Sequence, residues 1–226
     1  MTTEIAKIDP LQIKTDLAHQ AVATYMDEGC SFTIASISKN IDINEVDFFD
    51  YFPHKTAALH HFYTSIPDRY RAMVSEIDGY ENLTAGEKLA NYIYTVFDML
   101  QEQRDFVEET FDPFVFKTVR TSDFEYESRK LISEFLENDR QIPPFTQMAL
   151  SLPVDRFLAY EMLHVIKFWL GDTSDGTERT SELVEKLTAF IDEILHTAIA
   201  DRGFDLAKFM VFNRIIPIPL IGRFLP

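Results

Sequence analysis

Cysteine and glycine are scarce in this sequence, and each scarcity narrows the class of protein. Cys30 is the one cysteine among 226 residues, which excludes an intrachain disulfide and a metal cluster built from several thiolates. With 7 Gly in the whole chain, few turns are enforced by composition, as is typical of a protein made of long regular elements. A reducing compartment is expected, and we predict a cytoplasmic location.

Positive charge and long apolar runs are also in short supply. The chain has 21 Lys and Arg against 37 Asp and Glu, a formal net charge of −16, so on average it repels phosphate backbones and anionic membranes. No stretch approaches the roughly 20 apolar residues that span a bilayer. Residues 1–10 contain no apolar run, so we expect no secretory signal.

Apolar and aromatic residues are plentiful. They make up 46% and 13% of the chain, and 20 residues are Phe. Each buried ring removes at least about 150 Å² from water and must pack against something. The composition therefore predicts an aromatic interior, or a cavity lined with rings.

In the N-terminal part, apolar residues recur three and four positions apart, which predicts helices. The first helix should end at Gly29, and Thr33 should cap a short second helix. Asn44 is a plausible cap for a third helix, which Pro53 should end because the residue before proline avoids helical geometry. A fourth helix should begin near His54.

Two capping boxes mark helices further along the chain. Thr84 and Glu87 have the spacing at which each side chain satisfies a free backbone amide in the first helical turn. Ser122 and Glu125 repeat this spacing. Inward-facing apolar residues follow both pairs, so we predict a helix after each.

The C-terminal half also reads as helical. Residues 106–119 contain Pro113 and predict one broken helix, and residues 139–153 contain three prolines and predict a loop. Amphipathic patterns predict long helices over residues 154–170 and about 180–200. No segment has an alternating pattern strong enough to predict a strand, so the predicted fold class is all-α.

A short helix, a turn and a second short helix, preceded by an amphipathic one, form an arrangement that places a recognition helix in a DNA major groove. Here the run from Thr33 to Lys55, with Tyr51-Phe52-Pro53 as its most specific part, resembles the DNA-binding domain of the TetR family of transcription regulators. The resemblance covers about residues 11–63, and beyond it the chain matches in length and helicity.

The resemblance implies three segments: a helix-turn-helix domain over residues 1–60, a helical regulatory and dimerisation domain over residues 61–202, and an apolar tail over residues 203–226. It implies a homodimer in which the two long C-terminal helices form a four-helix interface with the partner's copies. The function it implies is transcription regulation, with DNA binding modulated by a small apolar ligand.

Site residues in the head follow from the same resemblance. It implies that Thr33 touches a phosphate at the opening of the second helix and that Tyr51 and Lys55 form a phosphate-contacting pair. Core positions are implied for Ile37, Ile43, Phe48 and Phe52. The full set of predicted DNA-binding residues is Thr33, Lys39, Asn44, Glu45, Asp47, Phe49, Tyr51 and Lys55.

The head also departs from the family pattern. Asp42 stands in the turn where the family usually has Gly, and Phe49 lacks the hydroxyl commonly found there. Through His60 the chain has four Lys and nine acidic residues, although DNA affinity depends largely on cationic contacts to phosphates. The alternative function is therefore a TetR-fold protein with a degenerate head that binds a lipid or isoprenoid at a membrane surface.

Aromatic residues of the C-terminal domain have two interpretations, a plain core or the apolar ligand cavity that the resemblance implies. His164 lies among apolar residues and is either a satisfied core histidine or a polar anchor in that cavity. The predicted ligand-pocket residues are Phe97, Phe106, Phe111, Phe114, His164 and Trp169.

The tail over residues 203–226 is apolar and mildly basic, unlike the rest of the chain. Either it is an amphipathic anchor on a membrane surface, or it packs over the core of its own chain or of a partner. Pro217 and Pro219 make a continuous helix to its end implausible.

Catalytic and metal-binding motifs do not stand out. We find no Ser-His-Asp ordering, glycine-rich phosphate loop or paired-carboxylate motif, so we expect neither an enzyme nor a cofactor. His54 and His61 could share a helical face, but no further ligand lies at the usual spacing, and adjacent His60 and His61 point about 100° apart.

Overall fold

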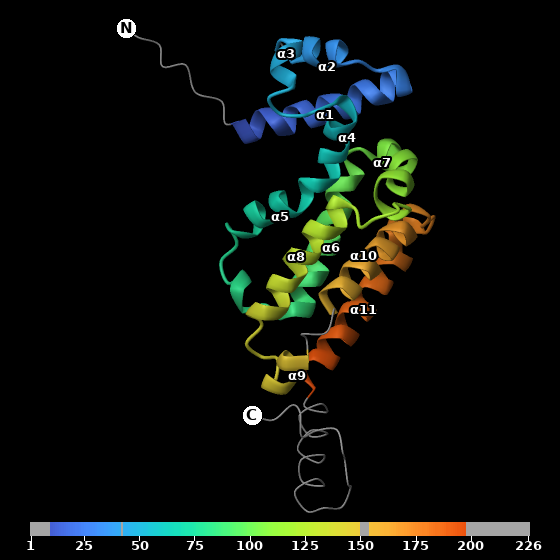
Figure 1. The fold of residues 1–226 in the computed structure, drawn as a ribbon. Coiled ribbons are helices and arrows are strands. Elements are labelled where there is room, and N and C mark those ends of the chain that lie inside the picture. The colour runs from blue at the N-terminus through green and yellow to red at the C-terminus, as the bar shows by residue number, and fades with distance from the viewer. Residues whose placement is uncertain (1–9, 42, 150–153, 198–226) are drawn as a thin grey trace, which may run out of the picture. The chain divides into compact units, whose positions relative to one another are not determined.

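A computed structural model describes residues 10–41, 43–149 and 154–197, and every regular element in these ranges is helical (Figure 1). The all-α prediction is confirmed. The chain divides into two compact units, which we call unit 1 (residues up to 78, with 94–128) and unit 2 (residues 79–93, with those from 129 onward). The predicted functional division at residues 60 and 202 stays a prediction.

Unit 1 begins with the predicted three-helix head. Gly29, at φ 60°, ends the first helix in the left-handed region that glycine tolerates. The Thr33 hydroxyl accepts a hydrogen bond from the Ser36 amide and caps the second helix, as predicted. Ile37 and Phe48 are fully buried between the helices. The elements are α1 (Pro10–Glu28), a 3-10 turn (Gly29–Ser31), α2 (Ile34–Asn40) and α3 (Glu45–Phe48).

The third helix is shorter than predicted. Helix α3 is a single turn, after which hydrogen bonds from the amides of Tyr51 and Phe52 to the Phe48 carbonyl continue it as tight turns. Pro53 ends the segment, as expected. Asn44 occupies the capping position, but its side chain bonds to Asp47 instead of to the backbone.

Helices α4 (Lys55–Thr64) and α5 (Ile66–Val74) follow, with Nδ1 of His54 capping α4 through the Ala57 amide. Pro67 lies in the first turn of α5, where a missing amide costs no helical bond. The predicted broken helix is α7 (Arg104–Phe111), which continues as a π-helical turn (Asp112–Phe116) containing Pro113.

Two helices contribute residues to both units, and the predicted caps open them. In α6 (Ala85–Gln101) the capping box is reciprocal: the Thr84 amide donates to Glu87 at 2.8 Å and the Glu87 amide to the Thr84 hydroxyl at 3.1 Å. In α8 (Asp123–Asn138) the Ser122 hydroxyl accepts from the Glu125 amide.

Unit 2 contains α9 (Pro144–Ala149), α10 (Val154–Leu170) and α11 (Glu178–His196), with 3-10 turns at Tyr80–Asn82 and Asp175–Thr177. The prediction of a loop over residues 139–153 was wrong where α9 forms. Proline disfavours a helix interior but fits the first helical position, where Pro144 stands. Helix α10 has the predicted bounds, and α11 begins two residues earlier than predicted.

Some expectations fall outside the described residues. They include the turn at Asp42 and both alternatives for the tail over residues 203–226. Among the helices that the structure describes, none has the length and apolarity needed to cross a membrane.

Candidate nucleic-acid interface

The exposed faces of α2 and α3 form the candidate nucleic-acid interface, and Figure 1 shows these two helices next to each other. Phe48 is fully buried and fixes α3 to the head, whereas Val46 and Phe49 are 76% and 56% exposed. Asn44, Glu45 and the remaining polar residues of this turn are also exposed. The buried ring therefore presents the rest of α3 to solvent.

Asn44 and Asp47, two predicted DNA-binding residues, contact each other. Nδ2 of Asn44 donates to Oδ2 of Asp47 at 3.0 Å. The bond orients the amide, leaving its carbonyl oxygen and its second N–H for an outside partner. Phe49 adds an exposed apolar surface on the same turn.

Thr33 is exposed, and its hydroxyl contacts the Ser36 hydroxyl at 2.9 Å. Ser36 in turn donates to Oε2 of Glu28 at 3.1 Å. A carboxylate thus lies beside the residue predicted to touch a phosphate. Its charge opposes an approaching phosphate group.

Lys55 faces the interior of the head. Its ammonium group donates to the carbonyl oxygens of Cys30, at 3.2 Å, and Phe32, and lies 4.2 Å from the centroid of the Phe32 ring. These contacts tie the start of α4 to the turn after α1. Tyr51, its predicted phosphate-contacting partner, is half-buried, and Lys39 is exposed in the last turn of α2.

Two hydrogen bonds join the head and α4 to α7 within unit 1. The Tyr25 hydroxyl donates to Oε1 of Glu109 at 2.5 Å, and the Tyr63 hydroxyl contacts the buried Thr110 hydroxyl at 2.7 Å. The bond to Glu109, with a smaller effect of burial, raises the pKa of Tyr25 to about 12. Burial raises the pKa of Tyr63 as well, so both tyrosines are neutral hydrogen-bonding groups at neutral pH.

The predicted ligand-pocket residues fall into both units. In unit 1, Phe106 and Phe111 are buried, with ring centroids 5.9 and 6.3 Å from that of Tyr63. Phe114 stacks on His60 at 4.3 Å, and Phe97 is buried in α6. The aromatic interior expected from composition is present, and the ligand role of these residues stays a prediction.

His164 and Trp169 lie on α10 in unit 2. Trp169 is 3% exposed. His164 is half-buried, and its Nδ1 lies 3.1 Å from the Tyr160 carbonyl oxygen one turn earlier. The predicted role of both residues as ligand contacts remains a prediction.

Sequence reasoning did not single out His19, and it weighed His61 only as a metal ligand. His19 on α1 and His61 on α4 each have a buried Nε2 that makes no hydrogen bond within the described residues. Burial lowers the pKa of both, that of His61 to about 4, and nearby Lys14 and Arg69 lower them further. Polar residues neighbour both histidines in sequence, and no local pattern indicates which side chains of other helices cover them.

Comparisons with known proteins agree with this architecture. Residues 88–210 match the family model described as "Tetracyclin repressor-like, C-terminal domain", a segment that the helix-turn-helix motif does not overlap. A solved structure, the TetR transcriptional regulator from Nitrosomonas europaea ATCC 19718, superposes with a TM-score of 0.58 at 15% identity, over 80% of this chain and 98% of the other. A search of curated protein sequences finds no match.

Proposed function

Because this chain belongs to the tetracycline-repressor-like (TetR) family of transcription regulators, we propose that it is a dimer whose heads bind DNA under the control of a small apolar ligand. The observation that carries the proposal is the exposed turn of α3. Its inner residue, Phe48, is fully buried while Val46 and Phe49 face solvent. A helix held this way can enter a groove.

Base reading rests on a few polar groups. Glu45 and Asp47 are exposed acceptors, and a carboxylate can accept a hydrogen bond from cytosine N4. Asn44 retains acceptor and donor capacity beside them. Since Lys55 donates to backbone carbonyls, phosphate contact falls mainly to Lys39, and DNA binding is expected to be weak and to show a shallow salt dependence.

Dimerisation is supported by exposed apolar side chains on α10 and α11. On α11 they are spaced seven and four residues apart and therefore share one helical face. Monomeric proteins rarely expose contiguous apolar surface of this kind. The residues are Phe157, Tyr160, Phe168, Leu183, Phe190 and Ile194, which are 37% to 60% exposed.

Ligand control requires an effector to bind two head positions with different affinity. The bonds from Tyr25 to Glu109 and from Tyr63 to Thr110 support such coupling, because they tie α1 and α4 to the aromatic residues around α7. A π-helical turn next to them interrupts α7, a feature that often occurs at functional sites. A small apolar ligand among these rings would act directly on both bonds.

Selection of DNA by the full-length protein from a random pool, at low salt, tests the proposal. We expect enrichment of a two-fold symmetric sequence, because a symmetric dimer presents two identical heads. An Asn44→Ala variant, changed at the exposed position directly before α3, should enrich it less. An unenriched pool would reject the DNA-binding part of the proposal.

A second candidate function is lipid or isoprenoid binding at a membrane surface by a head that no longer binds DNA. The observation in its favour is the exposed acidic surface of Glu45, Asp47 and Asp50, together with the inward-facing Lys55. Flotation with anionic liposomes would compare the full chain with one ending at Asp201. Equal flotation of the two would exclude a tail-mediated membrane role.

A further inference from the structure

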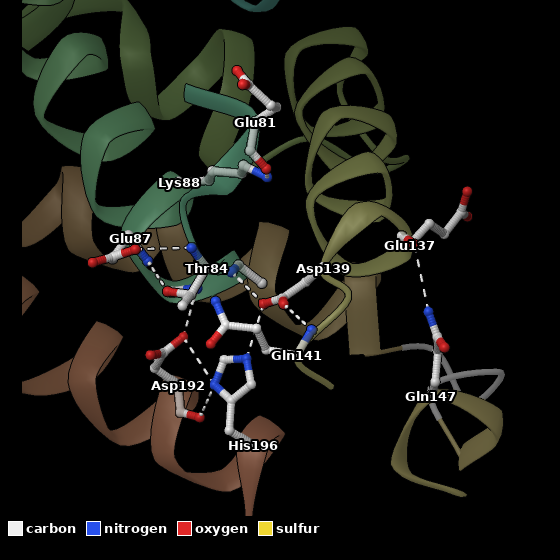
Figure 2. Close-up of polar contacts among 12 residues, drawn as sticks. Glu81, Thr84, Glu87, Lys88, Glu137, Asp139, Gln141, Gln147, Asp192 and His196 are labelled. Carbon is white, nitrogen blue, oxygen red and sulfur yellow. Dashed lines mark hydrogen bonds and ion pairs between the residues drawn. The ribbon is translucent and has the colours of Figure 1, made fainter. Parts of the chain in front are cut away.

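Three side chains that can bind metal meet in unit 2, whereas the candidate nucleic-acid interface belongs to unit 1. Asp139 follows α8, and Asp192 and His196 lie one turn apart on α11 (Figure 2). One ligand atom from each lies within 4.8 Å of the others. Among the described residues, no other three His, Cys, Asp or Glu side chains bring their ligand atoms this close together.

Both carboxylates are fixed by backbone amides at the start of α6. Oδ2 of Asp139, whose side chain is 1% exposed, accepts from the Ala85 amide at 2.7 Å, and Oδ1 of Asp192 accepts from the Gly86 amide at 3.1 Å. A Cβ atom at Gly86 would lie 2.7 Å from Cβ of Asp192. Glycine at this position therefore permits the close approach that brings Asp192 into the cluster.

Both ring nitrogens of His196 face acceptors. Nδ1 lies 2.8 Å from the Asp192 carbonyl oxygen, and Nε2 lies 3.0 Å from Oδ2 of Asp139. A neutral imidazole carries one N–H and can donate to only one of these oxygens. With the proton on Nδ1, Nε2 directs a lone pair at the Asp139 carboxylate, and a cation bound between Nε2 and Oδ2 would satisfy both.

The charges favour a divalent cation over a proton. With a neutral imidazole the cluster carries two negative charges, one of them on the buried Asp139 carboxylate. A proton on Nε2 neutralises one of these charges, whereas a divalent cation neutralises both. Burial without such compensation is costly.

We propose that Asp139, Asp192 and His196 bind a divalent transition-metal ion such as Zn²⁺. Zinc binds imidazole nitrogen and carboxylate oxygen at about 2.0 to 2.2 Å, which places neighbouring ligand atoms of a tetrahedral site about 3.4 Å apart. The 3.0 Å between Nε2 and Oδ2 is about 0.4 Å below this spacing, so the two ligand atoms move slightly apart when they bind the ion. The Asp192 carbonyl and the α6 amides hold the ligands from behind, as outer partners do in metal sites.

The site links the start of α6, the segment after α8 and the end of α11. Binding an ion there stabilises the folded state in proportion to its concentration over Kd. Mg²⁺ prefers oxygen ligands and octahedral geometry, so it should not bind this site and serves as a negative control. This site is independent of the proposed DNA-binding function.

Calorimetric titration of the chelator-treated full-length protein with Zn²⁺ tests the proposal. We expect one ion per chain and a rise in Tm with Zn²⁺ but not with Mg²⁺. Asp192→Asn keeps an acceptor for the Gly86 amide while removing the charge, and His196→Gln removes the imidazole. Each should lower zinc affinity at least about tenfold.

His164→Gln is the matched control, because His164 also lies 3.1 Å from the carbonyl oxygen one turn earlier on its helix but is outside the cluster. It should leave zinc binding unchanged. Absence of stoichiometric zinc binding, or binding that survives both cluster variants, would overturn the proposal. So would a Tm that Zn²⁺ does not raise.

Discussion

The ammonium group of Lys55 lies 4.2 Å from the centroid of the Phe32 ring and donates to the Phe32 carbonyl oxygen in the same head. A residue implied by resemblance to contact phosphate thus bonds to the chain's own backbone. This inward role changes what a substitution there should do.

Lys55→Met should destabilise the protein by about 1 to 2 kcal/mol, because it removes charge-assisted hydrogen bonds and a cation–π contact while keeping the aliphatic stem. Denaturant unfolding measures the change. Lys39→Met, at an exposed position, is the control and should shift stability by less than about 0.5 kcal/mol. Equal effects of the two substitutions would show that the Lys55 contacts do not stabilise the head.

Tyr25 and Glu109 should be energetically coupled. Tyr25→Phe removes the hydroxyl that donates to Oε1 of Glu109, and Glu109→Gln removes the charge that strengthens the bond. A double-mutant cycle by denaturant unfolding should give a coupling free energy of about 1 kcal/mol. Strict additivity of the two substitutions would contradict a bond between α1 and α7.

Much of this fold could be predicted from short stretches of sequence. Gly29, Thr33 and the pair Thr84 and Glu87 act within one helical turn of themselves, so their roles as helix stop and caps were predictable and are confirmed. Helix α9 was missed because three prolines suggested a loop, although proline fits a first turn.

Side-chain contacts between residues far apart in the sequence could not be predicted in the same way. Asp139 and His196 are 57 residues apart, and only the folded chain brings them within 3.0 Å. The four-residue spacing of Asp192 and His196 was the available signal, since it places both on one helical face. Lys55 illustrates the same limit, because the motif marks its position but not the direction of its side chain.

Acidification should lower the free energy of unfolding because His61 is partly buried. Its pKa in the folded state is lowered to about 4 by burial, so between pH 6.5 and 4 the unfolded chain binds more protons than the folded one. Stability is therefore complete above pH 6.5 and falls as pH drops through this window, by about 2 kcal/mol once partial solvation is discounted.

Unfolding of wild type and His61→Gln at pH 7.5, 6 and 4.5 measures this effect. The variant should lose less stability on acidification than wild type. Lys39→Met, changed at an exposed position, should retain the wild-type pH dependence. Parallel curves for wild type and His61→Gln would assign acid sensitivity to other groups.

Phe190→Glu should dissociate the proposed dimer, because it places a charge in the apolar face of α11, where Phe190 is 60% exposed in the single chain. Analytical ultracentrifugation measures the mass. Val119→Glu, at a residue that is fully exposed outside any helix, is the matched control and should leave the mass unchanged. A wild-type protein that sediments as a monomer, or a Phe190→Glu variant that stays dimeric, would place the interface elsewhere.

The most direct test of DNA binding through α3 is a fluorescence anisotropy titration at low salt, comparing an enriched DNA sequence with its scrambled version. Wild type should prefer the enriched sequence, and Asn44→Ala should lose about 1 to 3 kcal/mol of that discrimination while binding the scrambled DNA unchanged. Equal affinity of the wild-type protein for both sequences would contradict the account.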